Sequence, residues 1–125
     1  MNKNQVNKLL NRHLETWSES DVEIRKALIQ EIYTEDVEVV DPFSVIVGRQ
    51  TLNNFITELQ NKYPGYLFEL SKDIDSHNHI ARLNWRYGPP DNPDTITGQD
   101  IFVISAGRIE RLFVFVDGLK NDHSQ

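Results

Sequence analysis

The apolar residues of this chain follow two spacings, and the change at Pro64-Gly65 limits the folds available to it. Before that point three segments repeat apolar residues every three or four positions, as helices do. After it, four segments are rich in β-branched and aromatic residues and are separated by turn signals. Helices followed by a long sheet predict an α+β fold.

The three helical segments each predict one apolar face. The first runs from Val6 to Trp17, and the second from a capping box formed by Ser20 and Glu23 to about Tyr33. The third ends at Pro64-Gly65. Their apolar stripes are Val6, Leu9, Leu10, His13, Leu14 and Trp17; Ile24, Ala27, Leu28 and Ile32; and Leu52, Phe55, Ile56, Leu59 and Tyr63.

The predicted sheet is antiparallel, because short turns join its strands. The strands are residues 66–74, 79–88, 96–105 and 108–117, and the turns are Asp75 to Asn78, Gly88 to Asp94 and Ala106-Gly107. An earlier strand in VEVVDP adds to this sheet. A strongly curved sheet closing over a long helix leaves a cone-shaped barrel with one open pocket.

The last strand is apolar on both faces, with Phe113 and Phe115 on one and Leu112, Val114 and Val116 on the other. Three helices can cover only one face of the sheet. We therefore expect a homodimer that forms through the other face.

Composition restricts the partners. A chain of 125 residues with 38% hydrophobic residues predicts one domain, with a core at about 6–118 and a frayed tail at 119–125. The net charge of −6 argues against nucleic acid or an anionic membrane surface. Small molecules or proteins are therefore the expected partners. Without a signal peptide or the ~20 apolar residues of a membrane span, we expect a cytoplasmic protein. The absence of cysteine excludes disulfides and thiolate chemistry.

Asp41 stands at the end of an apolar strand and has two interpretations. It shares strand parity with Val37 and Val39, so it points inward if they do. A buried carboxylate is a stronger base than an exposed one. In the alternative, Asp41-Pro42 is a turn, in which aspartate caps nearby N–H groups and proline ends strand pairing.

Asp100 lies in the middle of TGQDIFVI, on the parity of Phe102, where both faces are apolar. An unpaired carboxyl group at such a site would stay neutral and act as a hydrogen-bond donor. The alternative is a structural acid paired with an arginine. The candidates are Arg82, Arg86 and Arg111.

The histidines and aromatic rings also permit two interpretations. His13 interrupts the apolar stripe of the first helix and is either a core residue or a site residue. His77 and His79 have a spacing seen in metal sites, but a hairpin tip explains them as well, and we expect no metal and no cofactor. The candidate pocket walls are Trp17, Tyr33, Phe43, Phe55, Trp85, Tyr87, Phe102, Phe113, Phe115 and Asp117.

Four segments together carry a family resemblance over about residues 6–118. They are "RHLETWSESD" at the end of the first helix, "YTEDVEVVDP" in the first strand, "VGRQTLNNFI" opening the third helix, and "TGQDIFVISAGRIERLFVFVD" as the final hairpin. In this order they resemble the nuclear-transport-factor-2-like superfamily, and most of all its SnoaL-like and ketosteroid-isomerase-like branch. The resemblance implies an α+β cone with a deep pocket between sheet and helices, commonly in a dimer.

The resemblance also implies roles for three residues. In ketosteroid isomerases the aspartate of the "DP" pair abstracts a proton next to a carbonyl group, and Asp41 holds that position. A protonated aspartate in the penultimate strand helps to hold the oxyanion, and Asp100 matches it. A tyrosine of the first helix completes that site, and this chain has His13 in its place.

Three functions fit these patterns. The first is a cofactor-independent enzyme that acts on an apolar carbonyl compound by isomerisation or cyclisation, with Asp41 as base and Asp100 and His13 as oxyanion stabilisers. The second is a carrier or sensor with the same pocket and no chemistry. The third is an association module that works through its sheet face.

Overall fold

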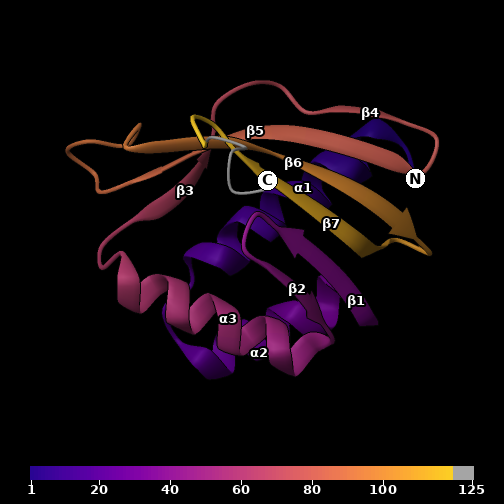
Figure 1. The fold of residues 1–125 in the computed structure, drawn as a ribbon. Helices are drawn as coiled ribbons and strands as arrows, with labels where there is room; N and C mark the ends of the chain where they lie inside the picture. Colours follow the sequence, from indigo (N-terminus) through magenta and orange to yellow (C-terminus); the bar gives the residue numbers. More distant parts are fainter. Residues whose placement is uncertain (120–125) are drawn as a thin grey trace, which may run out of the picture.

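The protein, described here over residues 1–119 of a computed structural model, folds as three helices packed against a curved sheet (Figure 1). This arrangement confirms the predicted α+β cone. The helices are α1 (Lys3–Ser18), α2 (Val22–Ile32) and α3 (Arg49–Lys62). The strands are β1 (Tyr33–Asp41), β2 (Ser44–Val47), β3 (Leu67–Leu70), β4 (Asp75–His77), β5 (Ile80–Gly88), β6 (Ile96–Ser105) and β7 (Arg108–Val116).

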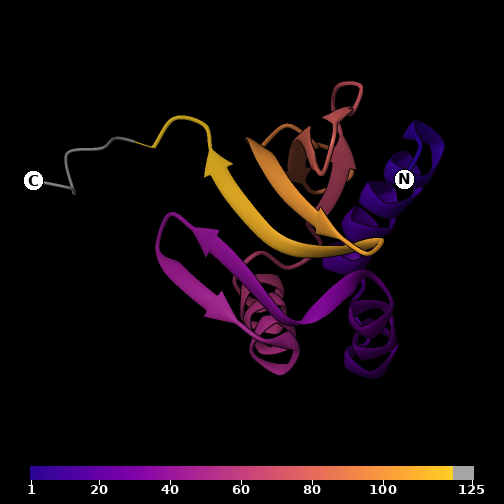
Figure 2. The ribbon, with the colours of Figure 1, turned by 90° about the vertical axis from the view of Figure 1, so that its right-hand side faces the viewer.

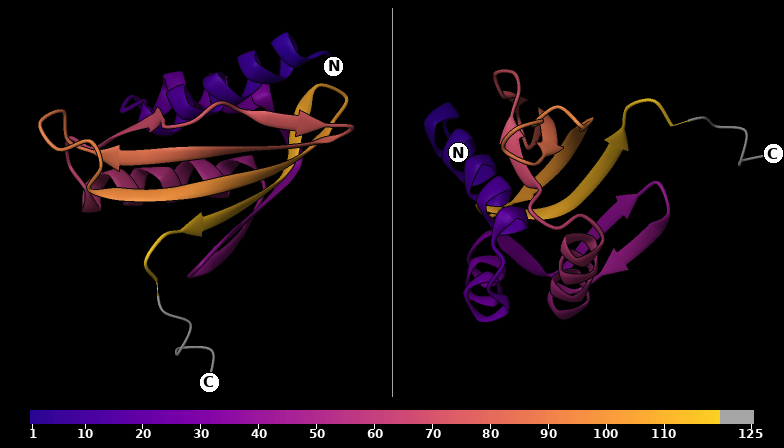
Figure 3. Two further views of the ribbon diagram at one scale, coloured as in Figure 1. Left: turned by 90° about the horizontal axis from the view of Figure 1, so that it is seen from above. Right: turned by 90° about the vertical axis from the view of Figure 1, so that its left-hand side faces the viewer.

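The sheet has the strand order β2-β1-β7-β6-β5-β3, and β4 also pairs with β5. The hairpins β5-β6 and β6-β7 are antiparallel, as predicted, whereas β1 pairs with β7 in parallel, so the sheet is mixed. Register shifts in β1 and at Val103/Ile104 mark bulges, which increase local bending. Figures 2 and 3 show the sheet curving around the helices without closing into a barrel.

Helix α1 begins where its first backbone N–H groups find partners. The side chain of Asn2 accepts from the N–H of Gln5, and the side chain of Gln5 accepts from the N–H of Asn2. The predicted apolar stripe is the buried face of this helix. No helix within residues 1–119 is long and apolar enough to cross a membrane.

Helix α2 departs from the prediction at its start and on its buried face. Its N-cap is Asp21, not Ser20, because the Asp21 carboxylate accepts from two backbone N–H groups of the first turn. Its buried residues include Arg25 and Ile29, whereas Ile24 is 52% exposed. The predicted stripe was wrong at Ile24, because it counted apolar residues alone and so omitted Arg25.

Two other expectations need correction or fall outside the structure. Residues 75–78 were predicted as a turn, but Asp75–His77 is the short strand β4, and the turn to β5 lies around Asn78, which has a positive φ of 52°. Of the predicted frayed tail at 119–125, residues 120–125 lie outside the described residues.

The loop before α3 brings the chain back to the start of β1. Gly48 has a φ of +92°, which glycine adopts without strain. The guanidinium of Arg49 then donates to the carbonyl oxygen of Tyr33, at 2.7 Å from Nη2 and 3.1 Å from Nε. The two residues thus fix the junction of α2 and β1, from which Tyr33 projects into the core.

Candidate functional site

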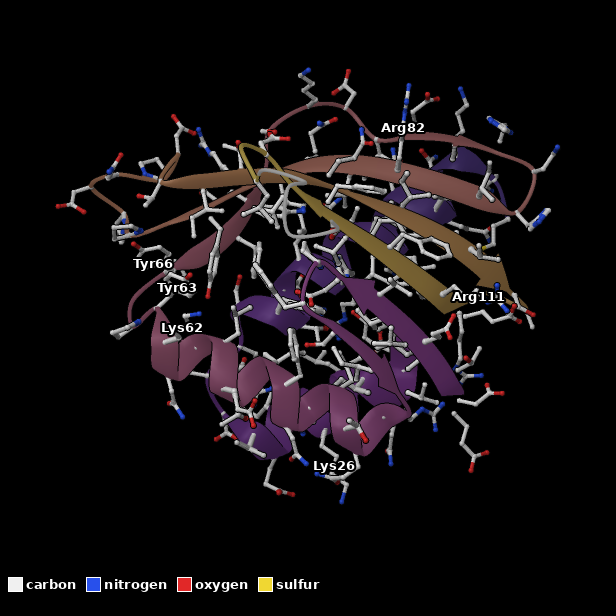
Figure 4. All side chains as sticks on the ribbon, viewed as in Figure 1. Lys26, Lys62, Tyr63, Tyr66, Arg82 and Arg111 are labelled. Carbon is white, nitrogen blue, oxygen red and sulfur yellow. The ribbon has the colours of Figure 1, made fainter. Side chains whose placement is uncertain are left out.

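A cavity of about 670 Å³ opens between the sheet and the helices α1 and α3. The turn between β1 and β2 and the loop before β6 also contribute to its lining. Figure 4 shows Lys62 and Tyr63 at the end of α3 and Tyr66 just beyond it, where the helix meets β3. The fold therefore has the open pocket that a cone of this kind permits.

Most of the residues singled out from the sequence meet at this cavity. Its lining includes His13, Trp17, Asp41, Phe43, Phe55, Trp85, Tyr87, Asp100 and Asp117. These residues come from α1, the β1-β2 turn, α3, β5, β6 and the end of β7. The tertiary structure thus brings together both aspartates and the histidine, which are up to 87 positions apart in the chain.

Asp41 combines the two interpretations that its sequence left open. Its Oδ1 atom accepts a hydrogen bond of 3.0 Å from the backbone N–H of Phe43, as an aspartate in a turn does. The residue is half-buried and also lines the cavity. Within residues 1–119 its Oδ2 atom has no hydrogen-bond partner, so this oxygen is available to accept a proton.

Asp100 is buried, and rings rather than arginines hold its two oxygens. Its Oδ1 accepts from the indole Nε1–H of Trp85 at 2.9 Å, and its Oδ2 lies 2.9 Å from Nε2 of His13. Arg82 and Arg86 of β5 and Arg111 of β7 each pair with another acid. The arginine pairing considered for Asp100 therefore does not occur.

His13 joins Asp100 to the core through a second hydrogen bond. Its Nδ1 lies 2.6 Å from the hydroxyl oxygen of Tyr33, which also accepts from Nε1–H of Trp17 at 2.9 Å. Burial raises the pKa of Tyr33 far above its usual value, so the phenol keeps its proton. The ring of Phe102 meets His13 edge-on at 4.9 Å and holds the imidazole in place.

The proton positions in this network follow from its donors. Trp17 can only donate, and among the described residues Nδ1 of His13 is the acceptor within reach of the Tyr33 proton, so donation from Tyr33 to Nδ1 satisfies all three groups. A neutral imidazole then carries its proton on Nε2 and donates it to Asp100. Both nitrogens of His13 are thereby used within the protein, which leaves none for a ligand.

Gly98 makes room for the indole that holds Asp100. It faces Trp85 across the β5-β6 ladder, and an added Cβ atom would collide with the indole ring and with the carbonyl oxygen of Phe115. The glycine of the TGQD segment therefore lets Trp85 lie flat against the sheet, with its N–H directed at Asp100.

Four of the predicted wall residues do not line the cavity. Tyr33 and Phe102 are completely buried behind His13, where they support it. Phe115 is 57% exposed and points to the outer face of β7, because Leu112, Val114 and Val116 take the inner positions. Phe113 shares the outer parity of Phe115. Apolar residues on both faces of β7 gave no means of choosing between the parities.

The candidate residues named from the sequence left out several cavity residues, and one group of these lies at the end of α3. Glu58, Leu59, Lys62 and Tyr63 follow Phe55 at helical spacing, so the stripe through Phe55 could have identified this face. The other missed lining residues are Ser44, Phe68, Thr95, Ile96, Thr97, Val114, Val116, Gly118 and Leu119. They depend on the curvature of the sheet, for which the sequence carries no local signal.

The paired histidines lie away from the cavity. His77 is on β4, His79 is in the turn that follows, and both are exposed. Across residues 1–119, no group of three His, Asp or Glu side chains is placed to hold a metal ion.

This combination of elements defines a class of small α+β proteins with the nuclear-transport-factor-2-like fold, in which helices and a curved sheet enclose one pocket. Within that class the chain belongs to the SnoaL-like domain family, which matches residues 10–112. The family resemblance stated from the sequence is thereby confirmed.

Solved structures show the same relationship. A "putative isomerase of the SnoaL-like family" from Agrobacterium tumefaciens is 32% identical, with a TM-score of 0.86 over 92% of this chain and 99% of the other. A "putative SnoaL-like polyketide cyclase" from Jannaschia sp. is 13% identical, with a TM-score of 0.75 over 91% of this chain and 86% of the other.

A third structure carries the fold without any natural relationship. A de novo designed protein with a curved β-sheet is 15% identical, with a TM-score of 0.74 over 94% of this chain and 89% of its own. The likeness to it and to the cyclase shows the fold alone, and function must be argued from the site. No curated protein matches this chain in sequence.

Proposed function

We propose that this protein is a small cofactor-independent enzyme that abstracts a proton next to the carbonyl group of an apolar compound, as an isomerase or a cyclase does. The observation that supports it is the pair Asp41 and Asp100, two carboxyl groups in different surroundings that line one aromatic cavity. Two such groups can divide the roles of base and hydrogen-bond donor. The SnoaL-like relative named as an isomerase is consistent with this chemistry.

In the proposed reaction, Asp41 is the general base. Its Oδ2 takes a proton from the carbon beside the carbonyl group, the C–H electron pair forms the carbon–carbon double bond of an enolate, and the carbonyl oxygen becomes an oxyanion. The turn hydrogen bond from Phe43 to Oδ1 holds the carboxylate in place. Return of the proton to another carbon completes an isomerisation. In an aldol-type cyclisation, the enolate carbon instead bonds to a second carbonyl carbon, and the oxygen of that carbonyl group takes the proton from Asp41.

Asp100 is the proposed donor to the oxyanion. Each of its oxygens accepts one hydrogen bond from a ring, and an oxygen that accepts one bond still has a lone pair that can carry a proton toward the ligand. His13 is a positioning residue in this scheme, because both of its nitrogens are bonded within the protein.

Deuterium exchange tests the proposal without knowledge of the natural substrate. The probe is 2-tetralone, an apolar bicyclic ketone, incubated with the full chain in D₂O while NMR follows its α-protons. Asp41→Asn should lower the catalysed exchange by ~10²–10⁴-fold, and Asp100→Asn by ~10²-fold or more. Asp75→Asn, an exposed carboxylate on β4, is the matched control and should exchange at the wild-type rate.

A ligand carrier is the second candidate, and one observation favours it. His13 and Trp85 already satisfy both oxygens of Asp100 without a ligand, as they would in a purely structural role. A carrier would bind 2-tetralone saturably with no exchange above the background rate, and Asp41→Asn would change its affinity only modestly. That result would reject the enzyme.

We also propose that two copies of the chain associate through the outer face of the sheet. Val40 faces Val45 on β2 and Phe113 on β7, so these three side chains form one apolar row across three strands. Val45 is 64% exposed and Phe115 is 57% exposed. The helices pack on the opposite face (Figure 3), which leaves this row uncovered in the single chain.

A further inference from the structure

The hydroxyl group of Tyr87 is buried and lacks a hydrogen-bond partner. Within residues 1–119, two buried side-chain oxygens have none, Oγ1 of Thr34 and the hydroxyl oxygen of Tyr87. Only Tyr87 lines the cavity. Leaving a buried polar group unpaired destabilises a fold, so such a group calls for a physical explanation.

The ring of Tyr87 is held firmly in its position. It stacks on Phe68 of the paired strand β3, with ring centres 3.9 Å apart and planes inclined by 17°. The rings of Tyr63 and Tyr66 meet it edge-on at 5.9 and 5.2 Å. Burial, with a smaller effect of these two neighbours, raises the pKa of Tyr87 to about 12, so at neutral pH the hydroxyl group carries its proton and can donate.

Tyr87 and Asp100 mark two separate places on the inner face of the sheet. Tyr87 pairs with Ile96 across the β5-β6 ladder, and Asp100 is four residues further along β6. Four residues of strand span ~13 Å. The side chain of Trp85, also on the inner face, lies between these two levels and lines the same cavity.

We infer that Tyr87 donates a hydrogen bond to an oxygen of the bound ligand, at the end of the cavity away from Asp100. The inference rests on the proposed function, since it takes the same cavity as the ligand site. The ligand class is then an apolar molecule with oxygen acceptors at both ends. One oxygen faces Asp100 near the base, and the other is selected by Tyr87, which makes Tyr87 a specificity-determining residue.

The first test uses the free protein. Tyr87→Phe removes the unpartnered oxygen and keeps the ring that stacks on Phe68. The variant should therefore unfold at a temperature higher than the wild type by about 3 °C or more. A lower unfolding temperature would mean that the hydroxyl group is satisfied within the protein, and it would overturn the inference.

The second test measures binding with two probes of the same shape. One is 2,6-diacetylnaphthalene, which has an acceptor at each end, and the other is 2,6-diethylnaphthalene, which has none. Tyr87→Phe should weaken binding of the diacetyl compound by about 5- to 10-fold and leave the diethyl compound within about twofold, as expected for one neutral hydrogen bond. Tryptophan fluorescence from Trp17 and Trp85 reports the binding.

Tyr66→Phe is the matched control, since Tyr66 belongs to the same ring cluster but does not line the cavity, and it should leave both affinities unchanged. Equal effects of Tyr87→Phe on the two probes, no effect on either, or a wild-type protein that binds neither would each overturn the inference. The comparison is repeated with Asp41→Asn. A Tyr87 effect that persists there while catalysed exchange is lost separates this inference from the enzymatic proposal.

Discussion

The hydroxyl oxygen of Tyr33 lies 2.6 Å from Nδ1 of His13, and Nε2 of the same ring lies 2.9 Å from Oδ2 of Asp100, so His13 links Tyr33 to the cavity. Because the Tyr33 oxygen already accepts from Trp17, donation of its own proton to Nδ1 satisfies all three groups, and His13 then presents its other N–H to Asp100. Tyr33 does not line the cavity, yet it acts through His13 on the hydrogen bond that Asp100 accepts.

Tyr33→Phe should release this constraint. Without the phenol proton, the imidazole of His13 is no longer confined to the form protonated on Nε2, and the indole N–H of Trp17 loses its acceptor. We expect the nitrogen chemical shifts of His13 to move toward a mixture of both forms, and the free energy of unfolding to fall by about 1–3 kcal/mol. Long-range proton–nitrogen NMR correlation and urea unfolding measure the two effects. Unchanged nitrogen shifts would contradict the proposed proton direction.

Arg25 should be the most sensitive charged residue for stability. It is completely buried, and neutral acceptors of α3 and of the α1-α2 connection hold its guanidinium: Asn53, Thr57, Gln60 and the carbonyl oxygen of Glu19. Burial lowers its pKa, but an arginine remains charged. Arg25→Ala leaves these acceptors unpaired, and we expect a loss of about 3 kcal/mol or more.

The control for Arg25 is the next residue on α2. Lys26 points away from the protein (Figure 4) and is exposed, so Lys26→Ala should change the free energy of unfolding by less than about 0.5 kcal/mol. Chemical unfolding of the two variants under the same conditions measures both values. Similar losses in both would show that the buried hydrogen bonds of Arg25 contribute little.

Alkaline pH should destabilise the protein through its buried phenols. An unfolded tyrosine loses its proton near pH ~10, whereas burial raises the pKa of Tyr87 to about 12 and that of Tyr33 further. The folded state binds these protons more tightly, so their contribution is complete below pH ~10 and is lost as the pH rises through the folded-state values. Urea midpoints measured at increasing pH should fall less steeply for Tyr87→Phe than for the wild type. Parallel curves would argue against the raised pKa.

The proposed dimer gives a direct test of the outer sheet face. Light scattering should show twice the 14.5 kDa of one chain, and Val45→Lys should reduce the mass to that of a monomer, because a charge would be buried in the apolar row. Ile24→Lys is the control, since Ile24 on α2 is exposed to a similar extent but lies off the sheet face. A wild-type monomer, or a dimer that survives Val45→Lys, would reject this interface.

Much of the fold could be predicted because the signals are local. The period of α1, the end of α3 at Pro64-Gly65 and the turn at Ala106-Gly107 depend on residues within a few positions of one another, and the structure has each of them. Errors arose where local chemistry allowed two outcomes. Ser20 and Asp21 are both good caps, and the charge of Arg25 concealed its place on the buried face of α2.

Part of the candidate site could also be predicted, because some of its signals are local in the sequence. Strand parity grouped Asp100 with Phe102, although both faces of that strand are apolar in the sequence, and the turn chemistry of Asp41-Pro42 was evident from the sequence. The sequence did not show which aromatic rings line the cavity. Strand β7 is apolar on both parities, and the curvature of the sheet decides which parity faces inward.

The sequence by itself determined the three helical segments, the strands of the final hairpins, the possibility of a turn at Asp41 and the absence of cysteine chemistry, since each follows from the residue types and their spacing. Only the tertiary structure decided that Trp85 and His13 bond to Asp100, that Tyr33 lies behind the site, and that the hydroxyl group of Tyr87 has no partner. These relationships join residues from different elements. They depend on the curvature and register of the packed sheet, and no local sequence signal specifies those.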